Sequence, residues 1–290
     1  MSTKAELLSY IRSQRIVSTH NHHLPDELHK GMSLHRILSG SYTNWMSPPP
    51  DLEDANAVRA YIRRFGANSF FRWLFAALED LYGLPFTPEN AAEIDQRIRK
   101  AYEDESYHLR LMFERCRFDR VINERQPDPG SNLGHPELFA PSFRCDCFFS
   151  GYLKDKPEPN GFVARSLFAN PDVATMEEYL AEMRQAIFAK KAAGCVALKV
   201  AIAYERPITF ENTDLAKAQR ALNNPDASEQ EVLDFGDAVM FEIAKIAAEA
   251  DMPLQIHTGM GQCKATNPIG LLKLIEANRD TKFHLLHGGF

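Results

Sequence analysis

Hydrophobic and polar positions follow two different rhythms along the chain. From residue 118 onward, short apolar runs alternate with longer segments whose apolar residues recur at helical spacing. This alternation predicts parallel strands joined by crossover helices. Six segments are expected as strands: 15–20, 119–126, 143–152, 195–204, 253–260 and 282–289. Helices are expected between them over 175–194, 214–224, 228–251 and 267–280.

The region between residues 31 and 117 has no convincing strand. Helices are expected there over 51–66, 68–83, 87–104 and 106–117, with a short leading helix over 6–14. Asn68 is a typical N-cap, Gly83 is typical of a helix end, and Thr87 stands before Pro88, the residue favoured at a first helical position. We therefore predict a single domain over residues 1–290 that carries a helical insertion over 31–117.

Polar and ionisable residues collect at the C-terminal ends of several predicted strands. Parallel α/β proteins place their chemistry at that end, in a (β/α)8 TIM barrel or along the edge of an open sheet. An open sheet that binds a dinucleotide has a glycine-rich turn after its first strand, whereas "THNHHLPDEL" contains no glycine. The barrel is therefore favoured. Because the sequence ends at "LLHGGF", directly after the sixth predicted strand, we expect an incomplete barrel.

Composition argues against several classes of function. The 290 residues include 33 basic and 39 acidic side chains without a basic block, which argues against a nucleic-acid partner. No apolar run approaches the roughly 20 residues that cross a bilayer, and the N-terminus lacks the apolar core of a signal peptide, so we expect no membrane partner and a cytoplasmic location. The five cysteines form no CxxC pair. We expect buried thiols, with Cys145 and Cys147 on one face of a strand.

Four of the ten histidines lie within residues 20–29, at the end of the first predicted strand. His20 and His22 are two apart, so both imidazoles point to the same side of the strand and can bind one divalent ion. Alone, this pair is a weak signal, because such pairs occur by chance in polar loops. His257 and His287 end two further strands at the same rim, and the three strands together favour a metal centre.

Lys199 lies within the apolar run "CVALKVAIAY", where a charged amine is costly unless it is paired or neutral. A structural salt bridge, a carbamate that bridges two metal ions and an amine that holds a substrate anion all remain open. Tyr204 and Arg206 follow this strand in a loop expected to overhang the barrel mouth, where they are candidates to bind a substrate carboxylate. Arg125, after "RVINE", is a weaker candidate for the same role.

Together these segments resemble the amidohydrolase superfamily of metal-dependent barrels. The resemblance rests on "THNHH", on a strand-borne lysine followed by "AYERP", and on "QIHTGMGQ" and "FHLLHGG". The segment "FFRWLFAALEDLYGL" is similar to the branch that contains uronate isomerase and the amidohydrolase-related proteins. The resemblance implies His20, His22 and His257 as metal ligands. It also implies catalytic positions for Lys199, on strand four, and His287, on strand six.

The resemblance further implies one or two divalent ions, with zinc as the expected metal, and hydrolysis of a small amide, ester or lactone whose substrate carries a carboxylate. Isomerisation of a sugar acid and non-oxidative decarboxylation use the same scaffold and remain alternatives. Members of the superfamily carry a metal-binding aspartate after strand eight, and no residue here takes that role. An inactive fragment or a binding module is therefore a third alternative. The exposed edges of an open barrel also predict pairing with another chain, for example as a homo-oligomer.

Overall fold

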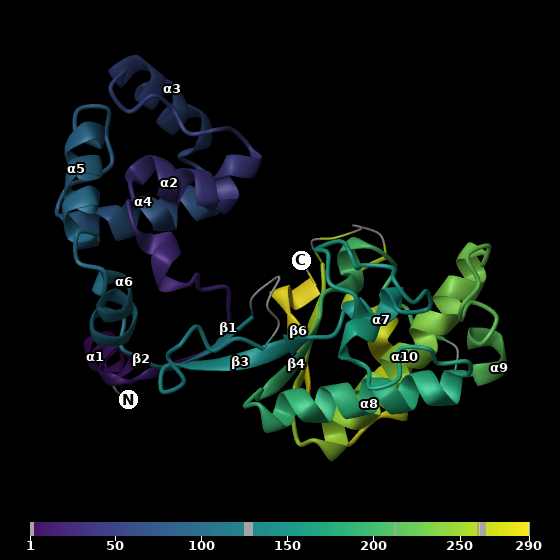
Figure 1. Ribbon diagram of the computed structural model, residues 1–290. Coiled ribbons are helices and arrows are strands. Elements are labelled where there is room, and N and C mark those ends of the chain that lie inside the picture. The colour runs from purple at the N-terminus through teal and green to yellow at the C-terminus, as the bar shows by residue number, and fades with distance from the viewer. Residues whose placement is uncertain (1–2, 125–129, 212, 260, 262–264, 290) are drawn as a thin grey trace. The chain divides into compact units, whose positions relative to one another are not determined.

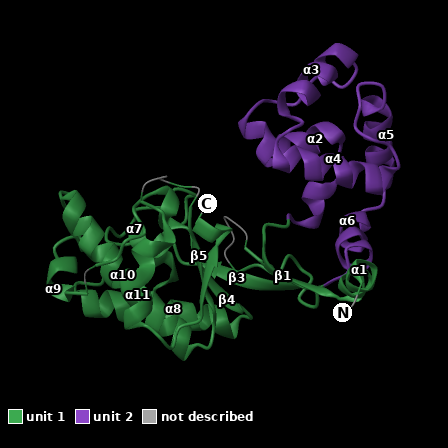
Figure 2. Ribbon diagram, turned by 180° about the vertical axis from the view of Figure 1, so that it is seen from behind, with its two compact units in different colours: residues 1–23, 119–290 green, residues 24–118 purple. Residues whose placement is uncertain are grey.

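The computed structural model describes residues 3–124, 130–211, 213–259, 261 and 265–289. The chain forms two units, one of residues 1–23 and 119–290 and one of residues 24–118 (Figure 2). Each unit has its own hydrophobic core. Arg125 and Cys263 lie outside the described residues.

The larger unit contains a six-stranded sheet whose strands follow chain order from β1 to β6 (Figure 1). The strands are β1 (Ile16–Asn21), β2 (Phe118–Asn123), β3 (Phe139–Arg144), β4 (Ala197–Val200), β5 (Leu254–His257) and β6 (Phe283–Leu286). Neighbouring strands from β2 to β6 pair in parallel. The predicted parallel α/β organisation is therefore confirmed.

Contacts between distant strands show that this sheet is curled. Neighbouring strands lie about 4.8 Å apart, so β1 and β5 would be roughly 19 Å apart in a flat sheet. Instead, Nε2 of Gln255 on β5 donates to the carbonyl oxygen of Thr19 on β1 at 2.6 Å. The rings of His20 on β1 and His287 after β6 have centroids 6.0 Å apart. The fold is thus the predicted TIM-barrel type, with six strands in the described part of the chain.

Helices flank the strands of this unit. They are α1 (Lys4–Ser13), α7 (Cys147–Ser150), η4 (Ala164–Leu167), α8 (Met176–Ala192), η5 (Ile202–Tyr204), α9 (Leu215–Ala218), α10 (Glu229–Glu249), η6 (Pro268–Leu271), α11 (Leu272–Ala277) and η7 (His287–Gly289). In both ribbon views α8 to α11 gather on one side of the sheet (Figures 1 and 2). None of the helices in the described ranges has the length and apolar composition that a bilayer crossing requires.

Alternation along the strands separates the core from the concave side of the sheet. Leu198 on β4 and Ile256 on β5 belong to the core cluster that α8 and α10 complete. Successive strand residues point to opposite faces, so Lys199, Gln255 and His257 face the other way. The bond from Gln255 to β1 shows that this second face is the concave one.

The smaller unit is entirely helical. Its elements are η1 (Asp26–His29), α2 (Leu34–Gly40), η2 (Tyr42–Trp45), α3 (Ala55–Phe65), α4 (Ser69–Tyr82), α5 (Ala91–Ala101), α6 (Tyr107–Arg110) and η3 (Leu111–Arg115). Asn68 caps α4, and Gly83 ends it in the left-handed region, as predicted. The predicted start of the next helix is wrong. Residues 88–90 form a turn closed by a bond from the Asn90 amide to the Thr87 carbonyl, so α5 begins at Ala91.

The strand expected over 143–152 is displaced toward the N-terminus. β3 already begins at Phe139 and ends at Arg144, after which α7 forms. Pro141 lies inside β3, and proline is uncommon within strands, so the sequence pattern hides this element. Cys145 and Cys147 consequently do not share a strand face.

Four of the cysteines lie in the described residues, and they are free thiols. Cys145, Cys147 and Cys195 are buried as predicted, whereas Cys116 is exposed, contrary to the prediction. Burial raises the pKa of Cys195 to about 11 and raises that of Cys147 further. The buried thiols are therefore protonated and unreactive at neutral pH.

Gln255→Met would remove the hydrogen bond between β5 and β1 at nearly constant side-chain volume. We expect a local loss of about 1 kcal/mol, which corresponds to roughly fivefold faster amide exchange in β1. Hydrogen exchange measures this effect, and Gln230→Met on the exposed start of α10 is the control. Unchanged exchange in β1 would contradict a role for Gln255 in holding the curl.

Candidate metal centre

A layer of polar side chains crosses the concave side of the sheet. The strand register pairs Arg144 with Lys199, Lys199 with Gln255, and Gln255 with His284. Register partners on parallel strands point to the same face, so these four side chains lie in one layer. Branched apolar residues usually fill the interior of such barrels. The polar layer is therefore a departure from the usual apolar interior of such a barrel.

Glu124, which directly follows β2, connects the charges of this layer. Its Oε1 accepts a hydrogen bond from Nη1 of Arg144 at 3.1 Å, and its Oε2 lies 3.6 Å from Nζ of Lys199. Nε of Arg144 donates to Oδ2 of Asp146 at 2.6 Å. Glu124, Lys199 and Asp146 are each only 1 % exposed. Two cations thus balance two carboxylates, which offsets part of the cost of burying Lys199.

The amine of Lys199 loses its proton more readily than an exposed lysine. Burial lowers its pKa to about 8, although Glu124 and Asp146 oppose the shift. Its salt bridge with Glu124, at 3.6 Å, is one of the pairings that the sequence left open. Its position in the interior layer is equally compatible with contact to a substrate anion.

Imidazoles from three strand ends converge beside this layer. Ring centroids lie 4.7 Å apart for His20 and His22, and 4.5 Å apart for His257 and His287. His287 lies 6.0 Å from His20 and so links the two pairs. The ring of Tyr204, after β4, is 4.6 Å from that of His257. The structure therefore brings together five of the side chains that the sequence selects.

Two of these imidazoles, those of His20 and His287, have lowered pKa values that favour the neutral form. Burial lowers the pKa of His20 to about 3, and the positive charge of Lys199 adds to the shift. Burial and Lys199 also lower the pKa of His287. A neutral imidazole has a free nitrogen lone pair, which is required both for metal binding and for accepting a proton.

The backbone at the end of β6 is unusual. His287 has φ 65°, and it is followed by Gly288 at 60° and Gly289 at 78°. A left-handed conformation costs a non-glycine residue roughly 1–2 kcal/mol. Such strain is found most often at functional sites, where the surrounding structure holds it in place.

Three potential ligand atoms, one each from His20, His22 and Glu124, lie within 4.8 Å of one another. Nδ1 of His22 donates to the carbonyl oxygen of Glu124 at 3.0 Å, which leaves Nε2 with its lone pair. Nδ1 of His20 and Oε2 of Glu124 are buried, and neither has a hydrogen-bond partner among the described residues. Buried polar atoms normally have partners. These two atoms therefore fit the ligand set of a divalent cation.

Glu124 was not selected from the sequence. Its one local signal is its position: it directly follows the apolar run "RVIN", at the same end of the sheet as the histidines. A carboxylate after a strand is common on protein surfaces, so this signal is weak without knowledge of the neighbouring strands.

Arg206 makes its contacts elsewhere. Nη2 of Arg206 pairs with Oδ1 of Asp237 on α10 at 2.6 Å, and Nη1 donates to the carbonyl oxygen of Leu233 at 3.1 Å. The second carboxylate oxygen of Asp237 accepts from the amide of Glu211 at 2.8 Å. The guanidinium thus ties the loop after β4 to α10. These contacts give no support to the expected role of Arg206 as a substrate anchor.

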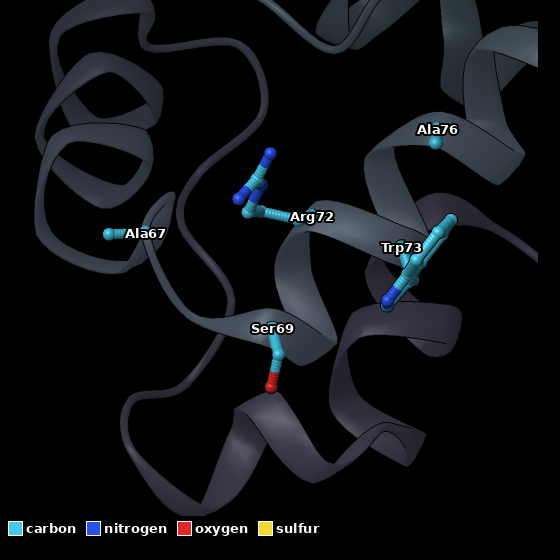
Figure 3. A pocket seen from close by; sticks show the side chains of 5 residues that line it. All are labelled: Ala67, Ser69, Arg72, Trp73 and Ala76. Carbon is cyan, nitrogen blue, oxygen red and sulfur yellow. The ribbon is translucent and has the colours of Figure 1, made fainter.

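The helical unit contains a separate pocket of about 340 Å³ along α4. It is lined by Ala67, Ser69, Arg72, Trp73 and Ala76, and Arg72 and Trp73 leave the helix in different directions (Figure 3). None of these five side chains is an acid, an imidazole or a thiol. This pocket therefore offers neither a general base nor metal ligands.

Solved structures of other proteins share this curled parallel α/β fold. A uronate isomerase from Thermotoga maritima matches with a TM-score of 0.69 and 17% identity over 97% of this chain and 72% of its own. A glucuronate isomerase from Caulobacter crescentus matches with a TM-score of 0.64 and 18% identity, over 87% of this chain and 59% of its own. A proposed metal-dependent hydrolase from Lactobacillus casei matches with a TM-score of 0.61 and 14% identity, over 97% of this chain and 69% of its own.

No protein-family model matches the sequence, and no curated protein matches it either. At identities of 14–18% the structural likeness establishes the fold, and it confirms the barrel expected from the amidohydrolase resemblance.

Asp237→Ala would leave the guanidinium of Arg206 buried without its carboxylate. We expect the free energy of unfolding to fall by about 3–5 kcal/mol, since breaking one side of a buried pair leaves an uncompensated charge. Urea unfolding measures the loss. Asp172→Ala, which breaks the exposed pair with Lys154, should change the free energy of unfolding far less. Equal small losses in the two variants would show that the Arg206 pair is not structural.

The carboxyl of Glu205 predicts an unusual pH dependence. The side chain is exposed on one side, but the protein atoms around it and the negative charges of Asp146 and Glu158 raise its pKa from 4.5 to about 7. Between the two pKa values, at pH 4.5 to about 7, the folded state keeps a proton on Glu205 that the unfolded state has lost. The free energy of unfolding therefore falls as the pH rises through this range. Glu205→Gln cannot ionise, and we expect it to be more stable than wild type at pH 8 but not at pH 4. Urea unfolding of both proteins at pH 4 and pH 8 measures this. If the variant and wild type differ in stability by the same amount at both pH values, the raised pKa of Glu205 is refuted.

Proposed function

We propose that this chain is a metal-dependent enzyme that acts on a small-molecule substrate. The observation that carries the proposal is the convergence of imidazoles from β1, β5 and β6 on the concave side of a curled parallel sheet. The low pKa of His20 and the buried, unbonded Nδ1 of its ring support a role as a ligand. We propose His20 and His22 as ligands, with His257 as the further imidazole of the centre and zinc as the metal.

Hydrolysis of a small amide, ester or lactone is the reaction we propose first. A bound zinc ion would lower the pKa of a coordinated water toward 7 and polarise a substrate carbonyl. His287, neutral at pH 7, can accept the proton of the water and pass it to the leaving group. Lys199 supplies a buried positive charge for an oxyanion or a substrate carboxylate. Tyr204, 54 % exposed beside His257, is placed to contact the substrate.

Isomerisation of a sugar acid is the second candidate. The observation in its favour is that both isomerase structures match with higher TM-scores than the hydrolase, 0.69 and 0.64 against 0.61. The same residues would serve this reaction, because His287 can carry a proton between two substrate atoms and Lys199 can bind the carboxylate. Non-oxidative decarboxylation of a carboxylate substrate places the same demand on Lys199.

Removal of either strand-one imidazole should empty the centre. We expect His20→Asn and His22→Asn to lose zinc affinity by more than about 100-fold, since loss of an outer-shell partner alone costs 10–100-fold. Metal analysis of the purified proteins measures this, with His135→Asn as the control. Unchanged metal content in both variants would rule out the shared site.

Turnover assays then distinguish the reactions. A panel of esters, lactones and amides tests hydrolysis, while uronates and aromatic carboxylates test isomerisation and decarboxylation. Zinc binding without turnover of any of these would favour a binding module.

A further inference from the structure

We infer that Glu124 is the carboxylate ligand of this centre and that Arg144 orients it. The inference rests on the proposed metal centre and assigns the acidic residue that the sequence left unassigned. Its basis is the group of ligand atoms from His20, His22 and Glu124, which lie within 4.8 Å of one another.

The two carboxylate oxygens of Glu124 have different surroundings. Oε1 accepts the hydrogen bond from Nη1 of Arg144 at 3.1 Å. Oε2 is buried, has no hydrogen-bond partner in the described residues, and lies 4.0 Å from Nε2 of His22. Arg144 is itself fixed by Asp146 at 2.6 Å. The guanidinium therefore holds the carboxylate so that one oxygen remains available to a cation.

The backbone of Glu124 fixes the same arrangement from the other side. Its amide donates to the carbonyl oxygen of Asn21 at 2.9 Å, which joins the ends of β1 and β2. Its carbonyl oxygen accepts from Nδ1 of His22 at 3.0 Å. Such a bond sets the tautomer of a metal-binding imidazole and increases its basicity. One residue thus orients a ligand and supplies another.

Two imidazoles and one carboxylate form a ligand set typical of catalytic zinc, with a fourth position open to water or substrate. Bond lengths of about 2.0–2.2 Å place neighbouring ligand atoms of a tetrahedral site roughly 3.4 Å apart. The 4.0 Å between His22 and Glu124 is therefore close to the bound distance, and small side-chain rotations can close the site.

Lys199 competes with the cation for Glu124. Its Nζ lies 3.6 Å from Oε2, the oxygen assigned to the metal. A positive charge at this distance opposes the binding of a second one. Lys199 therefore weakens metal affinity, whereas a carbamate on Lys199 would be a ligand and would strengthen it.

Zinc binding to the full chain tests these assignments by calorimetry and by metal analysis. We expect Glu124→Gln to weaken zinc binding by more than about 100-fold, as for loss of a ligand. Glu124→Asp keeps the charge but shortens the side chain, and we expect an intermediate loss. Lys199→Met should tighten binding by about tenfold or more. Glu137→Gln, which changes an exposed carboxylate on the same unit, should bind zinc as wild type does.

The outcomes separate the inference from the proposed function. Wild-type affinity in Glu124→Gln would overturn the role of Glu124 while leaving the metal centre intact. Absence of zinc binding by wild type would overturn both. Weaker binding by Lys199→Met would overturn the competition and favour the carbamate. If circular dichroism shows that Glu124→Gln does not fold, the zinc affinities of Glu124→Asp and Lys199→Met test the inference instead. Both variants keep a carboxylate beside Arg144.

Discussion

The curl of the parallel sheet is the constraint on which the site depends. β1 and β6 are the first and last strands of the sheet, yet the rings of His20 and His287 lie 6.0 Å apart. In a flat sheet of the usual spacing, these strands would be roughly 24 Å apart. The bond from Gln255 to Thr19 spans the concave side and holds the curl where the imidazoles meet. Without the curl of the sheet, each histidine would be an isolated residue at a strand end.

Buried charge serves two different purposes in this unit. Arg206 and Asp237 form an ion pair whose remaining atoms bond to nearby backbone, so the pair joins a loop to α10. The pair of Glu124 and Lys199 is longer, at 3.6 Å, and leaves Oε2 without a hydrogen bond among the described residues. Buried ion pairs contribute little to stability unless their polar atoms are satisfied. The incomplete pairing of Glu124 is therefore better explained by chemistry than by stability.

The sequence predicts those features that depend on local pattern. Apolar runs locate β1, β2, β4, β5 and β6. Histidines at the ends of β1, β5 and β6 predict which imidazoles meet. Features that depend on partners far away in the chain cannot be predicted from the local sequence pattern. Arg206 is as plausible a substrate anchor as Tyr204 until Asp237, 31 positions away, is placed beside it. Glu124 gains its meaning from Arg144 and Lys199 on other strands, and Pro141 conceals the true position of β3.

Assignment of Glu124 as a ligand changes what the other imidazoles can do. A metal needs a base beside it as well as ligands around it, and a side chain cannot fill both roles at once. If His257 must bind the metal, only His287 remains to carry protons. When Glu124 supplies the carboxylate, His20, His22 and Glu124 match the ligand set of a catalytic zinc site, and His257 would then act beside His287, whose ring lies 4.5 Å away, instead of as a ligand. The ring of Tyr204 lies 4.6 Å from that of His257, so this aromatic side chain stands on the β4–β6 side of the cluster. On the proposed assignment, the metal would lie on the β1–β2 side, and the substrate would bind between the metal and the imidazoles of His257 and His287.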